Sequence, residues 1–339
     1  MSTSVESPQP VDHPTGRFVE MVTTFVRRNR RPLSALVFFI VLIAIFVVAN
    51  PSLFLRPTIY NAVFVSLPIS IILVVPLVFL VTAGEIDLSF PSVVGMCAWG
   101  FAACIRAGWN PFTAILAALM VGTACGLMNG FLVTRVKLSS LVATLGMNFL
   151  LRGLINIGNQ GYGISVAQLR ATPFSEFFIG DIGGFPVQMI WAILFATIGQ
   201  LLFSRHRFGV QVAVVGDNQD SAREMGINVS RVKTMCYVYV GIACGLAAVF
   251  STLINSTFYP TTGEGYLLPV LAAVYVGGTP TWGGVGTVVG GVIGAFSVGF
   301  VETGIIASGL TGFFTQFFYG LIIILSLISH RFNQGRYRY

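Results

Sequence analysis

The chain has 339 residues, of which 55% are hydrophobic and only 9% are charged. Soluble globular domains carry about 25% charged residues, so this composition, with a mean hydropathy of +0.84, excludes an ordinary soluble protein and indicates a polytopic membrane protein. The formal net charge of +7 does not indicate a partner nucleic acid, because the basic residues lie at the ends of apolar segments instead of forming one basic face.

The N-terminal part of the chain divides into two polar regions. Residues 1–16 are polar and contain proline, so we expect a disordered cytoplasmic tail. Between residues 17 and 31, apolar side chains recur at helical spacing and basic residues follow them. This pattern predicts an amphipathic segment that lies along the membrane surface.

The rest of the chain predicts a single all-α transmembrane domain over residues 32–330, followed by a cytoplasmic tail over residues 331–339. About ten apolar segments are present, at residues 33–49, 59–82, 91–105, 112–133, 138–157, 187–203, 232–254, 266–277, 285–306 and 313–329. A perpendicular crossing needs about 20 residues. Segments 91–105 and 266–277 are short, so the chain crosses about ten times if they span the membrane and eight times if they re-enter.

The basic residues predict the orientation of the chain. If every segment crosses, only four of the 19 Lys and Arg residues fall toward one face of the membrane, namely Arg56, Arg106, Arg152 and Arg170. The positive-inside rule then places both termini in the cytoplasm, together with residues 205–233. Nine crossings would move residues 205–233 or the C-terminal arginines to the outside, so ten and eight crossings remain the alternatives.

Two interruptions rich in Gly and Pro adjoin the short segments. Ala83–Pro91 precedes one of them and Gly277–Gly284 follows the other. In transporters such interruptions often mark moving or substrate-facing elements, because their backbone groups need protein or water partners. Two tight cytoplasmic turns are the alternative interpretation.

Polar residues inside the membrane domain are candidates for a translocation pathway, because a hydrophilic solute needs hydrogen-bonding partners across the bilayer. They are Asp87, Ser89, Asn129, Asn148, Thr279 and Glu302. For the two asparagines, the alternative is hydrogen bonding between helices. Arg152 is a further ionisable residue in an apolar segment, and for it and Glu302 the alternative is anchoring at the membrane interface. Glycines at every fourth residue predict two helix-packing stripes, formed by Gly122, Gly126 and Gly130 and by Gly286, Gly290 and Gly294.

No pattern in the chain predicts catalysis. The chain has only two lysines, Lys137 and Lys233, and neither follows a glycine, so no Walker A phosphate-binding loop is present. The three histidines are isolated, and no His, Cys and carboxylate cluster has metal-ligand spacing. We therefore expect no enzymatic activity, no metal site and no cofactor bound by this chain.

Residues 205–233 form a compact polar stretch between two apolar segments. Asp217 or Asn218 can cap a short helix, and Gly226 can end it in a left-handed turn. The spacing Ala-x-x-Gly-x-Asn-x-x-x-Ala-x-x-x-Gly-Ile-Asn, over residues 213–228, resembles the coupling segment of permeases of ATP-binding cassette (ABC) transporters of the ribose, xylose and related monosaccharide branch.

Further motifs resemble the same family. Ile86–Ser89 matches its Ile-Asp-Leu-Ser signature, and residues 277–279 with 283–284 match its Gly-Gly-Thr and Gly-Gly signatures. Additional matches lie in residues 126–133 and 141–154, so the likeness covers most of the membrane domain. The chain departs from the signatures at Glu85, Phe90, Pro91 and Pro280, so the resemblance does not carry the identity of a substrate.

The resemblance implies a permease subunit of an importer in the bacterial cytoplasmic (inner) membrane, which passes a monosaccharide or polyol through the lipid bilayer. It implies three partners: a separate P-loop ATPase that binds ATP and Mg, an external sugar-binding protein, and a second permease copy or close paralogue. The ATPase would dock on the coupling segment, at Gly216, Asp217, Asn218, Asp220, Ala222, Arg223, Glu224, Gly226 and Ile227. The alternative is a stand-alone ion-coupled secondary transporter or facilitator for a small polar solute.

Overall fold

The computed structural model describes residue 24 and residues 29–334. The tail predicted at residues 1–16 lies outside the described residues, as do residues 335–339 and most of the surface segment predicted at residues 17–31. The last helix runs to Gln334 and so passes the boundary predicted at residue 330.

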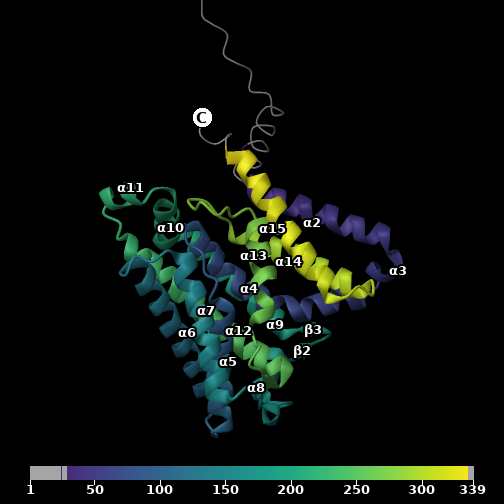
Figure 1. Cartoon of the computed structure of the whole chain (residues 1–339). Coiled ribbons are helices and arrows are strands. Elements are labelled where there is room, and N and C mark those ends of the chain that lie inside the picture. The colour runs from purple at the N-terminus through teal and green to yellow at the C-terminus, as the bar shows by residue number, and fades with distance from the viewer. Residues whose placement is uncertain (1–23, 25–28, 335–339) are drawn as a thin grey trace, which may run out of the picture.

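Helices form most of the described chain (Figure 1). Their bounds are α2 Arg30–Ala49, α3 Pro51–Phe54, α4 Pro57–Thr82, α5 Phe90–Arg106, α6 Pro111–Thr134, α7 Ser140–Asn159, η1 Ala167–Leu169, α8 Pro173–Ile179, α9 Val187–Arg205, α10 Arg207–Asp217, α11 Gln219–Glu224, α12 Val229–Asn255, η2 Glu264–Tyr266, α13 Leu267–Val276, α14 Val288–Ala307 and α15 Gly312–Gln334. Two antiparallel pairs of short strands complete the fold, β1 Ile164–Ser165 with β4 Thr257–Phe258 and β2 Asp181–Ile182 with β3 Phe185–Pro186.

Eight of the described helices are long and apolar enough to cross a membrane: α2, α4, α6, α7, α9, α12, α14 and α15. Two apolar helices are shorter, Phe90–Arg106 and Glu264–Val276, in agreement with the two short segments of the sequence. The prediction of an all-α polytopic membrane protein is confirmed. Whether the two short helices cross or re-enter stays a prediction.

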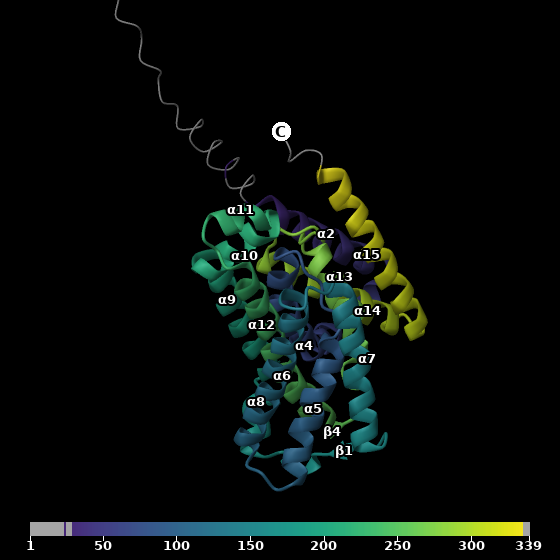
Figure 2. The same ribbon diagram turned by 60° about the vertical axis from the view of Figure 1, so that its left-hand side comes forward.

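The orientation of the elements agrees with the distribution of charge. The start of α2 and the end of α15 lie at the same end of the molecule as α10 and α11 (Figures 1 and 2). Helix α8 and the β1–β4 pair lie at the opposite end (Figure 2). We call these the cytoplasmic and external ends, because the positive-inside rule assigns the basic termini to the cytoplasm.

Helix α5 begins inside the helix bundle and not at its cytoplasmic end. The chain that precedes it runs along α12, where Tyr237 Oη donates to the carbonyl of Ile86 (3.4 Å) and Cys244 Sγ lies 3.6 Å from the carbonyl of Phe90. Lys233 near the start of α12 contacts Glu85. A helix rises 1.5 Å per residue, so Cys244 lies about 16 Å beyond Lys233 along α12. Residues 83–89 therefore carry the chain deep into the bundle before α5 starts.

The chain after α12 enters the bundle from the external end and meets the start of α5. At Gly263, whose φ of +95° favours glycine, an added Cβ would lie 2.0 Å from the carbonyl oxygen of Pro91. From there η2 and α13 run to the turn at residues 277–287, where the amide of Gly284 donates to the carbonyl of Thr82 (2.8 Å). The two interrupted helices therefore begin side by side and run toward opposite ends.

Glycine contacts hold α6 against α12. Added Cβ atoms would lie 2.1 Å from the carbonyl oxygen of Gly241 at Gly122, 2.4 Å from that of Tyr237 at Gly126, and 2.8 Å from Thr234 Cγ2 at Gly130. Gly290 and Gly294 of α14 similarly approach the carbonyls of Gly277 and Ala273. These short backbone separations are possible only because no side chain intervenes.

The second predicted stripe is wrong at Gly286. Helix α14 begins only at Val288, because the hydroxyl of Thr287 caps it by accepting from the amide of Gly290 (3.2 Å). Gly286 lies in the preceding turn, where an added Cβ would meet Thr82 Oγ1 at 2.1 Å. The small size of Gly286 therefore allows this turn to lie close to Thr82, and Gly286 takes no part in helix packing.

The replacement Gly126→Leu is expected to destabilise the fold by about 2–3 kcal/mol, because an added side chain has no space between α6 and α12. Thermal unfolding of the detergent-solubilised protein measures this as a lower Tm. Gly146→Leu on α7 is the matched control, since nothing lies within 4 Å of an added Cβ there. Equal Tm values for the two variants would show that the α6–α12 contact does not require glycine.

Candidate functional site

The polar stretch between α9 and α12 folds into two helices. Helix α10 was not predicted from the sequence, although the spacing of Phe208, Val212 and Val215, all buried, carries its signal. His206 caps it, because its Nδ1 accepts from the amide of Phe208 (3.1 Å). The apolar face of α10 fixes it on the bundle and sets the position of the short helix that follows.

Helix α11 has the ends that its residues predict. Asn218 Oδ1 accepts from the amides of Asp220 (2.9 Å) and Ser221 (3.1 Å), as an N-cap does. Gly226, with φ of +76°, ends the helix, and the amide of Ile227 donates back to the carbonyl of Ala222 (2.9 Å). The helix is therefore stabilised locally at both ends.

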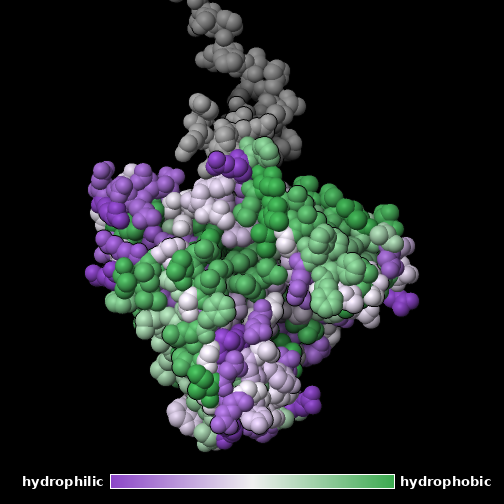
Figure 3. Space-filling view, in the orientation of Figure 1, coloured by the Kyte–Doolittle hydropathy of each residue, from purple (hydrophilic) through white to green (hydrophobic). Residues whose placement is uncertain are grey.

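Helix α11 presents a polar surface at the cytoplasmic end. Ala222 is buried and anchors the helix, whereas Asp220, Arg223, Glu224 and Met225 are exposed. Arg223 pairs with Asp220 within the helix. Figure 3 shows a hydrophilic corner at the position of α10 and α11, next to apolar surface below it. We call residues 219–225 the docking surface, after the ATPase-docking role that the sequence predicts for them and that stays a prediction here.

The end of α10 is in direct backbone contact with Thr82, the residue before the first interruption, and with the second interruption. An added Cβ at Gly216 would lie 1.7 Å from the carbonyl oxygen of Thr82 and 2.5 Å from the amide nitrogen of Gly284. At Gly283 it would lie 2.8 Å from the carbonyl oxygen of Gly216. We call Thr82, Gly216, Gly283 and Gly284 the glycine junction. It joins the docking surface to the chain before α5 and to the turn after α13 with no side chain between them.

A buried ion pair lies close to the glycine junction. Glu85 Oε1 pairs with Lys233 Nζ, and the two residues are only 8% and 7% exposed. Glu85 is one of the positions at which the chain departs from the signature that its sequence resembles. The pair ties residues 83–89 to the first turns of α12, directly after the docking surface. A buried charge that loses its partner is costly.

Four of the six predicted pathway residues lie around the start of α5. Asp87 Oδ1 accepts from the amide (2.7 Å) and the hydroxyl (2.6 Å) of Ser89. Because that hydroxyl donates its one hydrogen to Asp87, it accepts from Asn129 Nδ2 (2.7 Å). Asn148 Oδ1 accepts from the Ser92 hydroxyl (2.6 Å).

The other two predicted pathway residues lie elsewhere. Thr279 is fully buried in the turn after α13, where its hydroxyl has no hydrogen-bond partner among the described residues. Glu302 lies on α14 and accepts a hydrogen bond from Tyr319 Oη of α15 (2.7 Å). The structure therefore does not gather all six residues into one site.

Sequence reasoning missed a polar stripe along α7. Its residues recur at every fourth position, which places them on one face of a helix, and they are Ser140, Thr144, Asn148, Arg152 and Asn156. Ser140 Oγ and Thr144 Oγ1 accept from the amides of Ile86 (3.4 Å) and Leu88 (3.0 Å). The cytoplasmic half of the stripe thus satisfies the extended backbone before α5. The signal was present in the spacing.

Arg152 connects this stripe to the turn at residues 260–264, before η2. Its Nη1 donates to the carbonyls of Pro260 and Thr262, and its Nε lies 3.3 Å from Glu264 Oε1. Its Nη2 is buried and has no partner among the described residues. The guanidinium therefore holds the 260–264 turn against α5 and α7, which is a more specific contact than interfacial anchoring.

The described residues contain no group of three or more His, Cys, Asp or Glu side chains that could hold a metal ion. The chemistry that the arrangement does offer is hydrogen bonding. Hydroxyl, amide and guanidinium groups surround the place where α5 and η2 begin.

Comparison with known proteins gives a consistent result. Residues 59–327 match the family described as branched-chain amino acid transport system / permease component. The chain is 30% identical to the ribose import permease protein of Escherichia coli (strain K12), over 87% of this chain and 92% of that protein. It is also 30% identical to the D-allose transport system permease protein of the same organism, over 85% of this chain and 86% of that protein.

A third relative is the autoinducer 2 import system permease protein of Yersinia enterocolitica, which is 30% identical over 90% of this chain and 83% of that protein. No solved structure matches the chain.

Removal of one partner of the buried ion pair is expected to destabilise the protein by about 3–5 kcal/mol, because the other charge stays buried and unpaired. Glu85→Gln and Lys233→Met should each lower the Tm strongly. The double variant should recover much of the loss, so the two effects should not be additive. Additive losses in a double-mutant cycle would show that the two charges do not interact.

Proposed function

From the premise that the chain belongs to the family of branched-chain amino acid transport system permease components, we propose that it passes a monosaccharide or polyol inward while a separate ABC ATPase drives the cycle. The expectation of an importer permease, made from the sequence motifs, is confirmed by this membership and by the relatives. The choice of a sugar-like solute rests on relatives whose names concern ribose and D-allose.

The observation that carries the proposal is the glycine junction. The docking surface is exposed, short and capped at both ends, so it can meet a soluble partner as a rigid unit. Gly216, near the end of α10 and just before the docking surface, touches the backbone at Thr82 and Gly284 without an intervening side chain. A displacement of α11 by the ATPase would therefore move both interruptions together, because a close-packed protein interior has low compressibility and transmits strain.

The two interruptions position the helices that would open and close the path. Helices α5 and α13 begin side by side inside the bundle, at the contact between Pro91 and Gly263. Arg152 holds the 260–264 turn in that position. Movement of the junction would separate these helix starts and release hydrogen-bonding groups to the solute.

The hydroxyl groups of a sugar can replace one partner in the side-chain hydrogen bonds around the start of α5. Ser92 with Asn148 and Ser89 with Asn129 are side-chain pairs that a hydroxyl can replace, because a hydroxyl both donates and accepts. Arg152 Nη2, which has no partner among the described residues, can donate to a hydroxyl of the solute. Asp87 would act by holding Ser89 and not by contacting the solute.

The remaining parts of the proposal concern the assembly. The chain would carry no enzymatic activity, and the partner ATPase would bind ATP and Mg. A second permease copy and an external sugar-binding protein would complete an importer in the bacterial cytoplasmic membrane. Support comes from the bacterial relatives named as import permeases and from the exposed apolar faces of α2, α7 and α15, which lipid or a second copy would cover.

Charge reversal on the docking surface tests the function. The double variant Asp220→Arg and Glu224→Arg is expected to lose the ATPase during co-purification, with a fall in affinity of about tenfold or more for two rim charges. The Tm of the permease should change little, because both side chains are exposed and the pair of Asp220 with Arg223 lies at the surface. Asp181→Arg, at an exposed position of the external end, is the matched control.

Two outcomes would contradict the proposal. Retention of the ATPase at full affinity by the reversed variant would show that α11 is not the docking surface. ATP-independent uptake by the purified chain alone in proteoliposomes, with a proton or sodium dependence, would identify a secondary transporter.

A further inference from the structure

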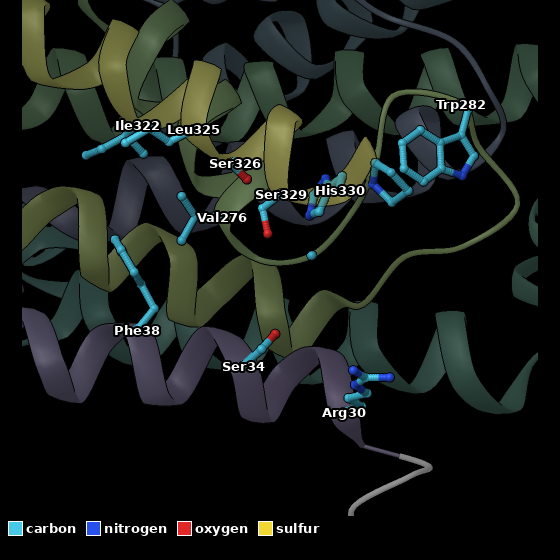
Figure 4. Close-up of a pocket in the computed structure, with 12 residues that line it drawn as sticks. Arg30, Ser34, Phe38, Val276, Trp282, Ile322, Leu325, Ser326, Ser329 and His330 are labelled. Atoms are coloured by element: carbon cyan, nitrogen blue, oxygen red, sulfur yellow. The ribbon is translucent and has the colours of Figure 1, made fainter. Parts of the chain in front are cut away.

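A cavity of about 390 Å³ lies at the cytoplasmic end, outside the residues proposed for transport. Three walls form it: α2, the turn that begins after α13, and the last part of α15 (Figure 4). Its lining residues are Arg30, Ser34, Phe38, Val276, Gly278, Pro280, Trp282, Ile322, Leu325, Ser326, Ser329 and His330.

The lining changes from polar to apolar along the cavity. Figure 4 shows Phe38, Val276, Ile322 and Leu325 at one side, and Arg30, His330 and Trp282 at the other, with the serines between them. The Trp282 and His330 rings meet edge to face, with centroids 6.2 Å apart. The polar side carries an arginine and a histidine, and no lining residue is acidic.

The gradient follows the depth of the membrane. Arg30 is the first residue of α2, and Phe38 lies about 12 Å further along that helix toward the bilayer interior. On α15, His330 lies near the cytoplasmic end and Ile322 lies the same distance inward. The charged side of the cavity is therefore at headgroup level, and the apolar side is at the level of the acyl chains.

An amphiphile fits this gradient better than a sugar does, because a sugar has no long apolar part to cover Phe38 and Ile322. The charge favours an anion, since arginine binds phosphate through paired hydrogen bonds. Basic pockets between transmembrane helices on the cytoplasmic side recognise the headgroups of acidic lipids. We propose that this cavity binds an anionic phospholipid of the cytoplasmic leaflet, with its phosphate near Arg30 and its chain against Phe38 and Ile322.

The position of the cavity would let a bound lipid influence the glycine junction. Gly278 and Pro280, which form one wall, belong to the same turn as Gly283 and Gly284 of the glycine junction. An occupied cavity would brace this turn against α2 and α15. Binding itself does not depend on the proposed transport function, so it can be tested without a transport assay.

Thermal unfolding of the purified full chain in detergent, with added dioleoyl phosphatidylglycerol or dioleoyl phosphatidylcholine, tests the site. Phosphatidylglycerol at about 100 times its Kd is expected to raise the Tm by about 5 °C, and phosphatidylcholine should have little effect. Arg30→Gln, which removes the charge, and Ser326→Trp, which fills the space, should each lose most of the shift. Arg205→Gln is the matched control, because it removes an exposed cytoplasmic arginine that does not line the cavity.

The outcomes separate a lipid from a simple anion and from a general surface effect. An equal shift in all four proteins, or no shift in the unmodified chain, would overturn the site. An equal shift with sodium phosphate in place of the lipid would overturn the assignment to a lipid. If Ser326→Trp does not fold, Arg30→Gln and the phosphate control still decide the result.

Discussion

The close approach of three backbone segments at the glycine junction is the constraint on which the rest of the structure depends. Gly216 reaches the carbonyl of Thr82 and the amide of Gly284 at distances that no side chain allows. Helix α10 packs on the bundle through Phe208, Val212 and Val215, and this packing fixes the position of Gly216 at the cytoplasmic end. The two interruptions are thereby joined to each other, through the bond from Gly284 to Thr82, and to α11.

Interrupted helices leave backbone groups without helical partners inside a membrane protein, where each unsatisfied group is costly. The chain meets this requirement with side chains from neighbouring helices. Ser140 and Thr144 accept from the amides before α5, and Arg152 donates to the carbonyls before η2. The same groups can exchange partners, so the residues that stabilise the interruptions are also suited to a polar solute.

Local patterns made much of the fold predictable. Hydrophobic length identified the long helices and the two short ones, and Asn218 with Gly226 set the ends of α11. Helix α10 was missed because its N-cap and first residues, from His206 to Gly209, resemble a connector. Gly286 was misplaced because glycine periodicity alone does not show that Thr287 starts a helix.

The site was less predictable because it depends on contacts between distant residues. Glu85 and Lys233 lie 148 positions apart, and Arg152 lies 108 positions from Pro260. Neither pairing leaves a local pattern in one sequence. Asp87, Ser89, Asn129 and Asn148 could be nominated as polar residues in apolar segments, but only the structure shows that they surround the start of α5 while Thr279 and Glu302 do not.

The most direct test of the account is ATP-driven solute uptake by the assembled permease and ATPase in proteoliposomes, compared between Gly216→Ala and Gly320→Ala. An added Cβ at Gly216 would displace Thr82 and Gly284, whereas nothing lies within 4 Å of one at Gly320. The account predicts that Gly216→Ala keeps the ATPase bound but loses uptake by about tenfold or more, a barrier increase of about 1.4 kcal/mol. Equal uptake by the two variants would show that the junction does not transmit the motion of the ATPase.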